Sequence, residues 1–353
     1  MKRNNLYDIT ITFDSRQEKK LFSGAIPYLG SATYTDKLDI YQNEIKISCN
    51  RTSIIELDEI FYNHNSSLYN QIIKALVYFY AINFSCPAIK EIIVTLKAQS
   101  GTSKTKKLKS TEIIQPVAGK IISKVQFDPN KIDIIFQENE KGKSLLIALS
   151  YWLKAMSTND PVFTFERLWR GFNRIYSIIG QSESETDCHI AMRKFTIAHT
   201  NILKHSLKEV QKYSQQTLRN SFRWRGLILN DYPTQRKTPQ FKEFILRYKD
   251  ERVMKLIQET LPYRQEYLTK ENLIVTVMDH INKYLATPVK SDAELISLLC
   301  IKYMYFVRNK SFHGEKIDGA FRLLENKETK ELEKLNLIHS SYIADLINSN
   351  DKY

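Results

Sequence analysis

The sequence has few cysteines and no pattern of metal ligands. Four cysteines occur among 353 residues, and no two of them form a CxxC pair. Structural zinc sites need such closely spaced Cys or His pairs. Asp, Glu and His residues do not cluster with metal-ligand spacing either. The sequence therefore predicts reduced, separately buried thiols, no metal and no cofactor.

Long apolar segments are also missing. The longest apolar run, around residues 75–84, is far shorter than the roughly 20 residues with which a helix spans a bilayer. The first residues, Met-Lys-Arg-Asn-Asn, are not followed by the apolar stretch of a secretory signal. We find no internal repeat and no low-complexity tract. These absences favour a cytoplasmic protein that does not enter the membrane.

Acidic residues are too few to balance the basic ones. The chain has 52 Lys and Arg against 39 Asp and Glu, a formal net charge of +13. A polyanionic partner explains such an excess, because contacts with phosphates release counterions. A Lys- and Asn-rich composition, common in AT-rich genomes, also produces a basic chain without any such partner. The charge therefore favours a nucleic-acid partner without requiring one.

The N-terminal third mixes strand and helix signals. Alternating polar and apolar residues predict strands over residues 7–14, 39–48, 91–98 and 131–137. Apolar residues at helical spacing over 66–84 predict a helix, which Pro87 closes. Residues 99–110, rich in Ser, Thr and Lys, read as a solvated loop in preference to a phosphate-binding one. Residues 1–138 are therefore predicted to form an α+β domain of unknown role.

From about residue 141 the strand signals stop and the chain reads as all-α. Apolar residues three and four positions apart predict a helix over 141–156 and a second over 161–180, after the break STNDP. We expect these two helices to pack as an antiparallel hairpin. Residues 181–290 read as further, less regular helices.

Two late helices follow. The first begins at Ser291, where Glu294 completes a capping-box pattern, and runs into the segment 303–314. The second covers roughly residues 318–346. Three histidines, His205, His280 and His339, are isolated in the sequence and read as packed or exposed residues without a catalytic role.

The first late helix leads into the segment that carries the candidate chemistry, Arg308-Asn309-Lys310-Ser311-Phe312-His313-Gly314. His313 can accept the proton of a ribose 2′-OH or protonate the departing 5′-oxygen, because imidazole titrates near neutrality. Arg308 stays charged and can bind phosphoryl oxygens as negative charge builds on them. The amide of Asn309 can orient the pair or hydrogen-bond a phosphate. These three are the candidate catalytic residues.

Helix geometry constrains this site. Five residues turn a regular helix by about 500°, which leaves Arg308 and His313 about 140° apart. We therefore expect the helix to end or bend here, with Gly314 as the candidate stop. The spacing alone is not specific, because Arg193 and His199 form a similar pair.

The context of the motif is more informative. Residues 303–314 (YMYFVRNKSFHG) resemble the signature of the HEPN (higher eukaryotes and prokaryotes nucleotide-binding) family. In that family an apolar helix leads into Arg, a polar residue that is usually Asn, Asp or His, a short variable stretch and then His. Residues 148–156 and 165–176 also look like the first two helices of the family. The resemblance covers roughly 145–180 and 290–345.

The resemblance implies a fold and an assembly. The expected fold class is an α+β domain, 1–138, followed by an all-α HEPN-like helical bundle, 139–353, with its core at 141–180 and 290–347 and a helical insertion at 181–290. Family members usually dimerise and set two Arg/His motifs across one cleft. We expect a homodimer here, because one His cannot readily serve as acid and base at the same instant. The apolar run 303–307 is the candidate contributor to that interface.

The resemblance also implies a function. Family members include toxins, CRISPR-associated ribonucleases and abortive-infection proteins that cleave RNA without a metal. The expected activity is metal-independent endoribonuclease chemistry by 2′-OH transesterification, in phage defence or as a toxin, with RNA as substrate and an antitoxin or defence-system partner protein. The alternative is a non-catalytic HEPN module that binds RNA or a protein.

A second basic segment reads in two ways. Arginines beside aromatic residues suit contact with an RNA backbone and stacking on its bases. This reading makes Arg219, Arg223, Trp224 and Arg225 candidate RNA-binding residues. In the other reading Phe222 and Trp224 fill the core while the arginines face water.

Overall fold

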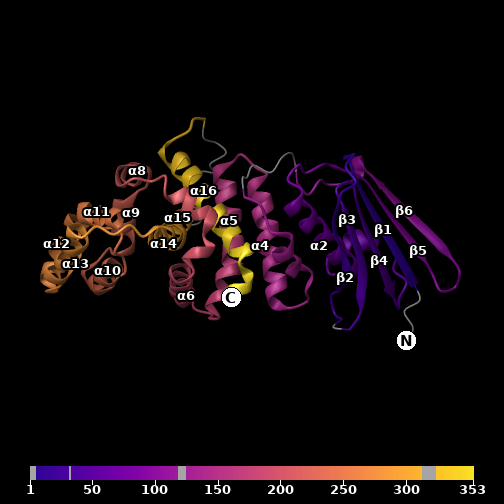
Figure 1. Cartoon of the computed structure of the whole chain (residues 1–353), viewed down its shortest axis with the longest axis horizontal. Coiled ribbons are helices and arrows are strands. Elements are labelled where there is room, and N and C mark those ends of the chain that lie inside the picture. Colours follow the sequence, from indigo (N-terminus) through magenta and orange to yellow (C-terminus); the bar gives the residue numbers. More distant parts are fainter. Residues whose placement is uncertain (1–4, 32, 118–124, 312–322) are drawn as a thin grey trace. The chain divides into compact units, whose positions relative to one another are not determined.

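The chain divides into two compact units in the computed structural model, which describes residues 5–31, 33–117, 125–311 and 323–353. Unit 1 comprises Met1–Asn159 with Asn350–Lys352, and unit 2 comprises Asp160–Ser349 with Tyr353. The first holds a six-stranded sheet and the second is mainly helical (Figure 1). The predicted order, an α+β part followed by a helical part, is confirmed.

Unit 1 is built on an antiparallel sheet with the strand order β2-β3-β4-β1-β5-β6. The strands are β1 (Asn5–Phe13), β2 (Lys20–Pro27), β3 (Thr35–Tyr41), β4 (Glu44–Arg51), β5 (Ile89–Lys97) and β6 (Ser103–Lys109). Every second residue of β1 is buried, as expected for a sheet with one face on the core. The helix α2 (Ser67–Ile82) packs on that face, where Phe79 stacks on Phe13 with ring centroids 3.9 Å apart.

Two strand predictions in unit 1 are wrong. Residues 39–48 are not one strand, because β3 and β4 form a hairpin there in which Ile40 faces Ile45. Both isoleucines are buried, so the apolar periodicity runs through the turn and conceals it. Residues 131–137 are helical, in α3 (Pro129–Ile132) and η2 (Asp133–Phe136).

The loop predicted for residues 99–110 is also wrong, and β2 was not predicted. β6 pairs with β5 from Ser103 to Lys109 at the edge of the sheet. An edge strand needs no apolar face, and lysines on it discourage pairing with other chains. β6 therefore lacks the apolar alternation by which strands are recognised. The short α1 (Glu59–Tyr62) and η1 (Ser110–Glu112) complete this part of the unit.

The helix α4 (Glu140–Met156) belongs to unit 1, where it packs against α2 and η2. Its predicted apolar stripe, from Leu145 to Met156, is buried. The sequence-based boundary at 138/139 instead groups this helix with the later ones, in a hairpin with residues 161–180. The structure differs because the stripe of α4 packs against α2 and η2, and its Trp152 contacts the rings of Phe84 and Phe127.

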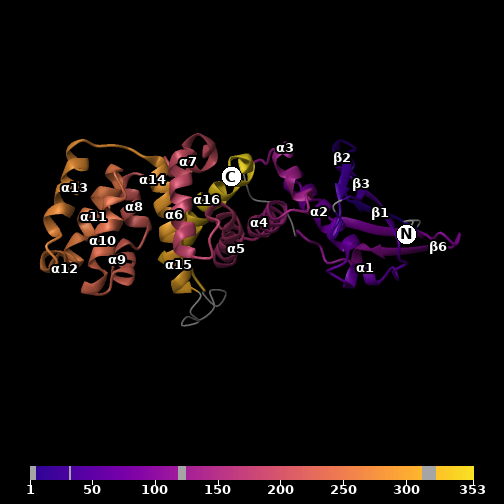
Figure 2. The same ribbon diagram turned by 90° about the horizontal axis from the view of Figure 1, so that it is seen from below.

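The core of unit 2 is a helical bundle drawn from both ends of that unit. It consists of α5 (Pro161–Gly180), α6 (Glu185–Ala198), the continuous segment α14 (Asp292–Ser297), η6 (Leu298–Tyr303) and α15 (Met304–Ser311), and α16 (Lys327–Asn348). α5 packs against α6 and α16, and α6 packs against α14 and η6 (Figures 1 and 2). Gly180 permits the close approach of α6 to α5, because a Cβ there would clash with Cys188.

Short helices fill the sequence between α6 and α14. They are η3 (Thr200–Ile202), α7 (Lys204–Val210), α8 (Gln215–Ser221), α9 (Trp224–Asp231), η4 (Gln235–Lys237), α10 (Thr238–Leu246), α11 (Glu251–Thr260), η5 (Leu261–Tyr263), α12 (Gln265–Lys270) and α13 (Ile274–Ala286). A last turn, η8 (Asn350–Lys352), belongs to unit 1. No helix in the described part of the chain is long and apolar enough to cross a membrane.

The caps explain where the late helices begin. The side chain of Ser291 accepts the N–H of Glu294, as the capping pattern predicts. α16 begins at Lys327 and not near residue 318, because Asn326 caps it by accepting the N–H of Thr329. Residues 318–322 of the predicted helix lie outside the described residues.

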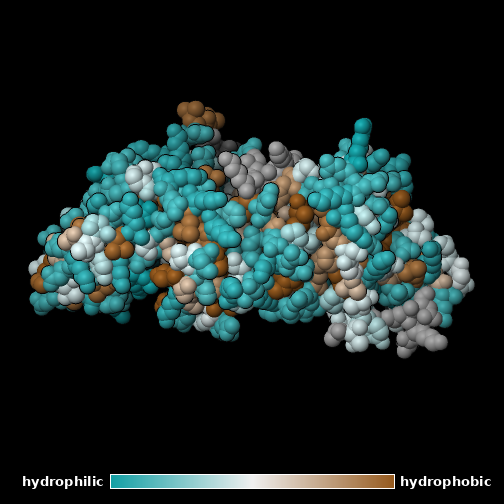
Figure 3. All heavy atoms as spheres, in the orientation of Figure 1, coloured by the Kyte–Doolittle hydropathy of each residue, from teal (hydrophilic) through white to brown (hydrophobic). Residues whose placement is uncertain are grey.

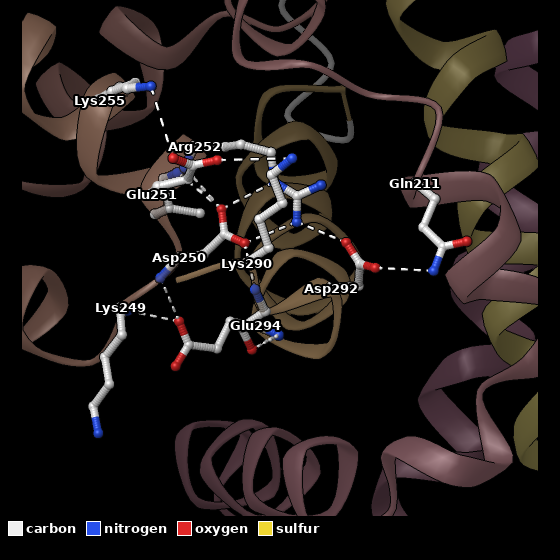
Figure 4. A network of polar contacts seen from close by, with 11 residues as sticks. Gln211, Lys249, Asp250, Glu251, Arg252, Lys255, Lys290, Asp292 and Glu294 are labelled. Carbon is white, nitrogen blue, oxygen red and sulfur yellow. Dashed lines mark hydrogen bonds and ion pairs between the residues drawn. The ribbon is translucent and has the colours of Figure 1, made fainter. Parts of the chain in front are cut away.

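A buried polar network fixes the start of α14 (Figure 4). We call it the Asp250 network; it comprises Lys249, Asp250, Arg252, Ser291, Asp292 and Glu294. Asp250 is fully buried and accepts the N–H groups of Arg252 and Ser291 at 2.9 and 2.7 Å. Glu294 accepts the N–H groups of Lys249 and Asp250 at 2.6 and 3.0 Å. The first turns of α11 and α14 are thereby tied together, which sets the position of the helix leading to Arg308.

Candidate functional site

Arg308 and Asn309 lie together near the end of the described part of α15. The Nη1 of Arg308 donates to the Oδ1 of Asn309 at 2.9 Å, and both side chains are half-buried. An amide that accepts from a guanidinium limits the directions in which the guanidinium can point. His313 and Gly314 lie outside the described residues, so their role and the end of the helix there stay predictions.

The described irregularity of this helix lies before Arg308. η6 is π-helical, with five of its six residues buried. A π-helical turn holds more residues than an α-helical turn and therefore changes which face the following residues occupy. Such turns are frequent at functional sites. The structure thus places a break in helical phase at Leu298–Tyr303, whereas the sequence argument placed a bend at 308–314.

The imidazole of His189 lies beside α15 in an aromatic setting. Its ring centroid is 5.1 Å from Tyr305, 5.1 Å from Tyr176 and 6.3 Å from Trp169. The Nε2 of His189 is buried and has no hydrogen-bond partner within the described residues. Burial lowers the pKa of His189, and the negative charge of Glu185 opposes that effect. The ring is therefore held neutral at physiological pH.

Glu185 provides the acidic group of the same region. It is half-buried in the first turn of α6, one turn before His189, and its Oε1 accepts the Oη–H of Tyr176 at 3.1 Å. Burial raises the pKa of Tyr176, and Glu185 acts in the same direction. Burial also raises the pKa of Tyr305. The hydrogen bond with Asn309 lowers this pKa, whereas Glu185 raises it further.

Arg308 belongs to the same electrostatic environment. Its positive charge lowers the pKa of both Tyr176 and Tyr305, against the effect of burial. We call this group the Arg308 cluster; it comprises Tyr176, Glu185, His189, Tyr305, Arg308 and Asn309. It joins α5, α6 and α15 and contains a fixed cation, a carboxylate and an imidazole. Such a set can bind a phosphate and move protons.

Glu185 and His189 were not predicted as site residues from the sequence. Their signal in the sequence is weak. The two titratable residues lie four positions apart after the capping residue Ser184 and share one helix face, as such pairs do in many solvent-exposed helices. The helix face that carries Glu185 and His189 becomes a candidate site only because it lies next to α15, where His189 contacts Tyr305.

The proposed base-stacking role of Trp224 is wrong for this conformation. Trp224 and Phe222 are only 8% and 5% exposed, and the Nε1 of Trp224 donates to the carbonyl oxygen of Leu218 at 2.8 Å. Both rings pack against Tyr303. A buried ring with its donor already used cannot stack on an RNA base.

The three arginines of that segment have separate partners. Arg223 pairs with the buried Glu331 through Nε at 2.7 Å, which explains its position without RNA. Arg219 is exposed and pairs with Glu259 at 3.2 Å. Arg225 lies over the ring of Tyr263, 4.6 Å from its centroid. All three arginines are exposed, and RNA contact by Arg219, Arg223 and Arg225 stays a prediction.

The predicted contribution of residues 303–307 to a dimer interface is contradicted for four of the five residues, and for the half-buried Tyr305 it stays a prediction. Tyr303, Met304, Phe306 and Val307 are 0 to 3% exposed within a single chain, so they fill the core of unit 2. The face shown in Figure 3 is mainly hydrophilic. The homodimer itself stays a prediction.

The isolated histidines have structural surroundings. The Nδ1 of His205 lies 2.7 Å from Asp345, and the Nε2 of His280 lies 2.8 Å from the carbonyl oxygen of Tyr248. His339 is fully buried, with its ring edge-on to Phe172. The other Arg/His pair is also occupied: Arg193 donates to the carbonyl oxygen of Arg247, and His199 packs on Phe195.

Within residues 5–31, 33–117, 125–311 and 323–353, no three His, Cys, Asp or Glu side chains are grouped so as to hold a metal ion. All four cysteines, Cys49, Cys86, Cys188 and Cys300, are free thiols and buried. Comparisons with protein-family models, with curated proteins and with solved structures find no match for this chain. The site must therefore be judged on its own chemistry.

Proposed function

We propose that this protein is a metal-independent endoribonuclease whose reaction centres on Arg308. The observation that supports the proposal is the Arg308 cluster, in which a half-buried guanidinium shares one environment with a carboxylate and phenols. A permanently charged group that is partly withdrawn from water stabilises a developing phosphorane strongly, because the local dielectric constant is low. The excess of 52 basic over 39 acidic residues favours the approach of a polyanion such as RNA.

The proposed reaction is a transesterification. The ribose 2′-oxygen attacks the adjacent phosphorus, the bond to the 5′-oxygen breaks, and the products are a 2′,3′-cyclic phosphate and a free 5′-OH. Arg308 binds the non-bridging oxygens as their charge increases. Asn309 orients Arg308 through the 2.9 Å hydrogen bond. The sequence motif supplies His313 as a proton-transfer group; this residue lies outside the described residues.

The biological setting follows from the resemblance to the HEPN family. A cell that makes an RNA-cleaving enzyme must restrain it, so we propose a role in phage defence or as a toxin, with a restraining antitoxin or defence-system partner. Expression of the wild-type protein alone should then slow growth, and variants without cleavage should not.

Substitution of Arg308 tests the proposal. Arg308→Ala should lower the rate of RNA cleavage about 10²- to 10³-fold, the usual cost of losing one group that stabilises the transition-state charge. His313→Ala should have a similar effect. Lys310→Ala is the matched control, since Lys310 is an exposed cation on the same helix. Its loss should change the rate only a few-fold.

Three outcomes contradict the proposal. If Arg308→Ala and His313→Ala cleave RNA as fast as the wild type does, the reaction does not centre on Arg308; if the wild type cleaves no RNA and both variants keep its effect on growth, the chain is a non-catalytic module. If Lys310→Ala is as damaging as Arg308→Ala, the general basic surface and not a defined site is responsible.

A further inference from the structure

α6 packs against α14 and η6, the segment that leads into α15. The two segments run antiparallel. The charges of Arg193 in α6 and Glu294 in α14 both change the pKa of Tyr248, so these two residues lie at a similar height along the two segments. Further along the segments, the charge of Lys302 lowers the pKa of His189, and the ring of His189 contacts the ring of Tyr305.

Helix geometry extends this register by one more turn. From His189 back to Glu185, and from Tyr305 forward to Arg308 and Asn309, the backbone advances by about 5 to 6 Å in each helix. Because the helices are antiparallel, both steps lead toward the same end of the bundle. The contributions of Glu185 and Arg308 to the pKa of the same two phenols, Tyr176 and Tyr305, agree with this placement.

The surroundings of Glu185 suit a group that exchanges protons. The carboxylate is half-buried and accepts the Oη–H of Tyr176 at 3.1 Å, and a side-chain hydrogen bond with Glu185 also raises the pKa of Tyr305. Burial and the neighbouring carboxylate keep both phenols protonated, so they act as hydrogen-bond donors and not as bases. The Nε2 of His189 is buried and has no hydrogen-bond partner within the described residues. Glu185 is thus the base that the described residues of the cluster offer to a substrate held by Arg308.

We infer that Glu185 is the general base of the Arg308 site and takes the proton of the attacking ribose 2′-OH. This inference rests on the proposed function and assigns the proton acceptor within it. The 2′-OH proton moves to a carboxylate oxygen of Glu185 while the 2′-oxygen bonds to phosphorus. The bond from phosphorus to the 5′-oxygen breaks, and that oxygen leaves with a proton from the proton-transfer group of the proposed function. Exchange of one proton with water then restores both groups.

This assignment changes the argument for a dimer. The sequence argument required a second copy of the motif because one histidine cannot act as acid and base at once. With Glu185 as the base, a single chain holds both the cation and the proton acceptor. A protomer whose partner is inactive therefore retains cleavage.

The test is the pH dependence of cleavage by Glu185→Gln, with a labelled single-stranded RNA of mixed sequence as substrate. Glutamine keeps an oxygen that accepts from Tyr176, so the packing is preserved while the base is lost. The rate should fall about 10²- to 10³-fold, within the range of general-base catalysis. The wild-type rate should fall as acid protonates the carboxylate, and this limb of the profile should be missing in the variant.

Two variants separate catalysis from structure and from net charge. Asp187→Asn removes the same charge from the same exposed turn of α6, and its rate should stay within a few-fold of wild type. Tyr176→Phe removes the hydrogen bond to Glu185 but leaves the base, so it should keep the acid limb of the pH profile.

Each outcome is decisive. If Arg308→Ala abolishes cleavage while Glu185→Gln keeps both the rate and the acid limb, the inference fails and the proposed function stands. If the cleavage rate of Asp187→Asn falls as far as that of Glu185→Gln, the loss comes from the change in net charge and the inference also fails. If the wild type does not cleave RNA, the proposed function fails and the assignment of Glu185 fails with it.

Discussion

Unit 2 contains two polar clusters on the same continuous helix, and they differ in how deeply their charged groups are buried. In the Asp250 network the buried carboxylate receives the guanidinium of Arg252 at 3.0 and 2.8 Å, and Asp292 receives the same guanidinium at 2.7 Å (Figure 4). In the Arg308 cluster the cation and the carboxylate are half-buried, and an imidazole nitrogen lies buried without a partner in the described part of the chain.

This difference in burial distinguishes a network that stabilises the fold from a cluster that we propose acts on a substrate. Burial would lower the pKa of Arg252, but its hydrogen bonds to Asp250 and Asp292 outweigh this and raise it. A charge so completely compensated has no capacity left for a ligand, and removing one partner leaves the other buried and unpaired. Groups that are only half-buried, as Arg308 and Glu185 are, should cost less in stability when they are changed.

The largest stability effect is expected in the Asp250 network. Asp250→Ala leaves Arg252 with one carboxylate partner and deprives the N–H of Ser291 of its acceptor. The free energy of unfolding should fall by about 3 to 5 kcal/mol, measured by urea denaturation. Glu251→Gln is the control, because the lysine partners of Glu251 lie 3.9 Å away, and it should cost under about 1 kcal/mol. Equal stability of Asp250→Ala and wild type would contradict the distinction.

A smaller effect is expected from the buried histidine of α16. Burial lowers the pKa of His339 from 6.5 to about 3. Below pH 6.5 the unfolded chain binds a proton that the folded chain does not, so stability falls as the pH falls toward 3. Between pH 7 and pH 5 this residue should account for a loss of about 2 kcal/mol.

Substitution by leucine isolates that contribution. His339→Leu keeps a side chain of similar volume beside Phe172 but cannot titrate. Urea denaturation at pH 7 and pH 5 should show a smaller loss of stability in the variant than in the wild type. An identical loss in both proteins would show that His339 is not buried as a neutral ring.

Several elements could be predicted because their local signals are strong. The alternation in β1 and β5, the cap of α14 at Ser291 and the helical spacing of α5 reflect neighbours in the sequence. β6 and the turn between β3 and β4 could not be predicted, because an edge strand lacks an apolar face and the turn lacks a break in periodicity.

The site was predictable only in part. Arg308 and Asn309 stand in a recognisable segment, and the structure places them side by side. Glu185 lies 123 positions earlier (308 − 185), and only the antiparallel packing of α6 against α14 and η6 brings it near. Trp224 was misassigned because a buried ring and a stacking ring look alike in a sequence.

The central claim is most directly tested by incubating the purified wild-type protein with RNA in excess EDTA and analysing the ends of the products. Arg308 and the proton-transfer groups require no metal ion, so cleavage should proceed at an undiminished rate and give 2′,3′-cyclic phosphate and 5′-OH ends. Arg308→Ala under the same conditions should form these ends about 10²- to 10³-fold more slowly. Cleavage that stops in EDTA and returns with magnesium or manganese would contradict the account.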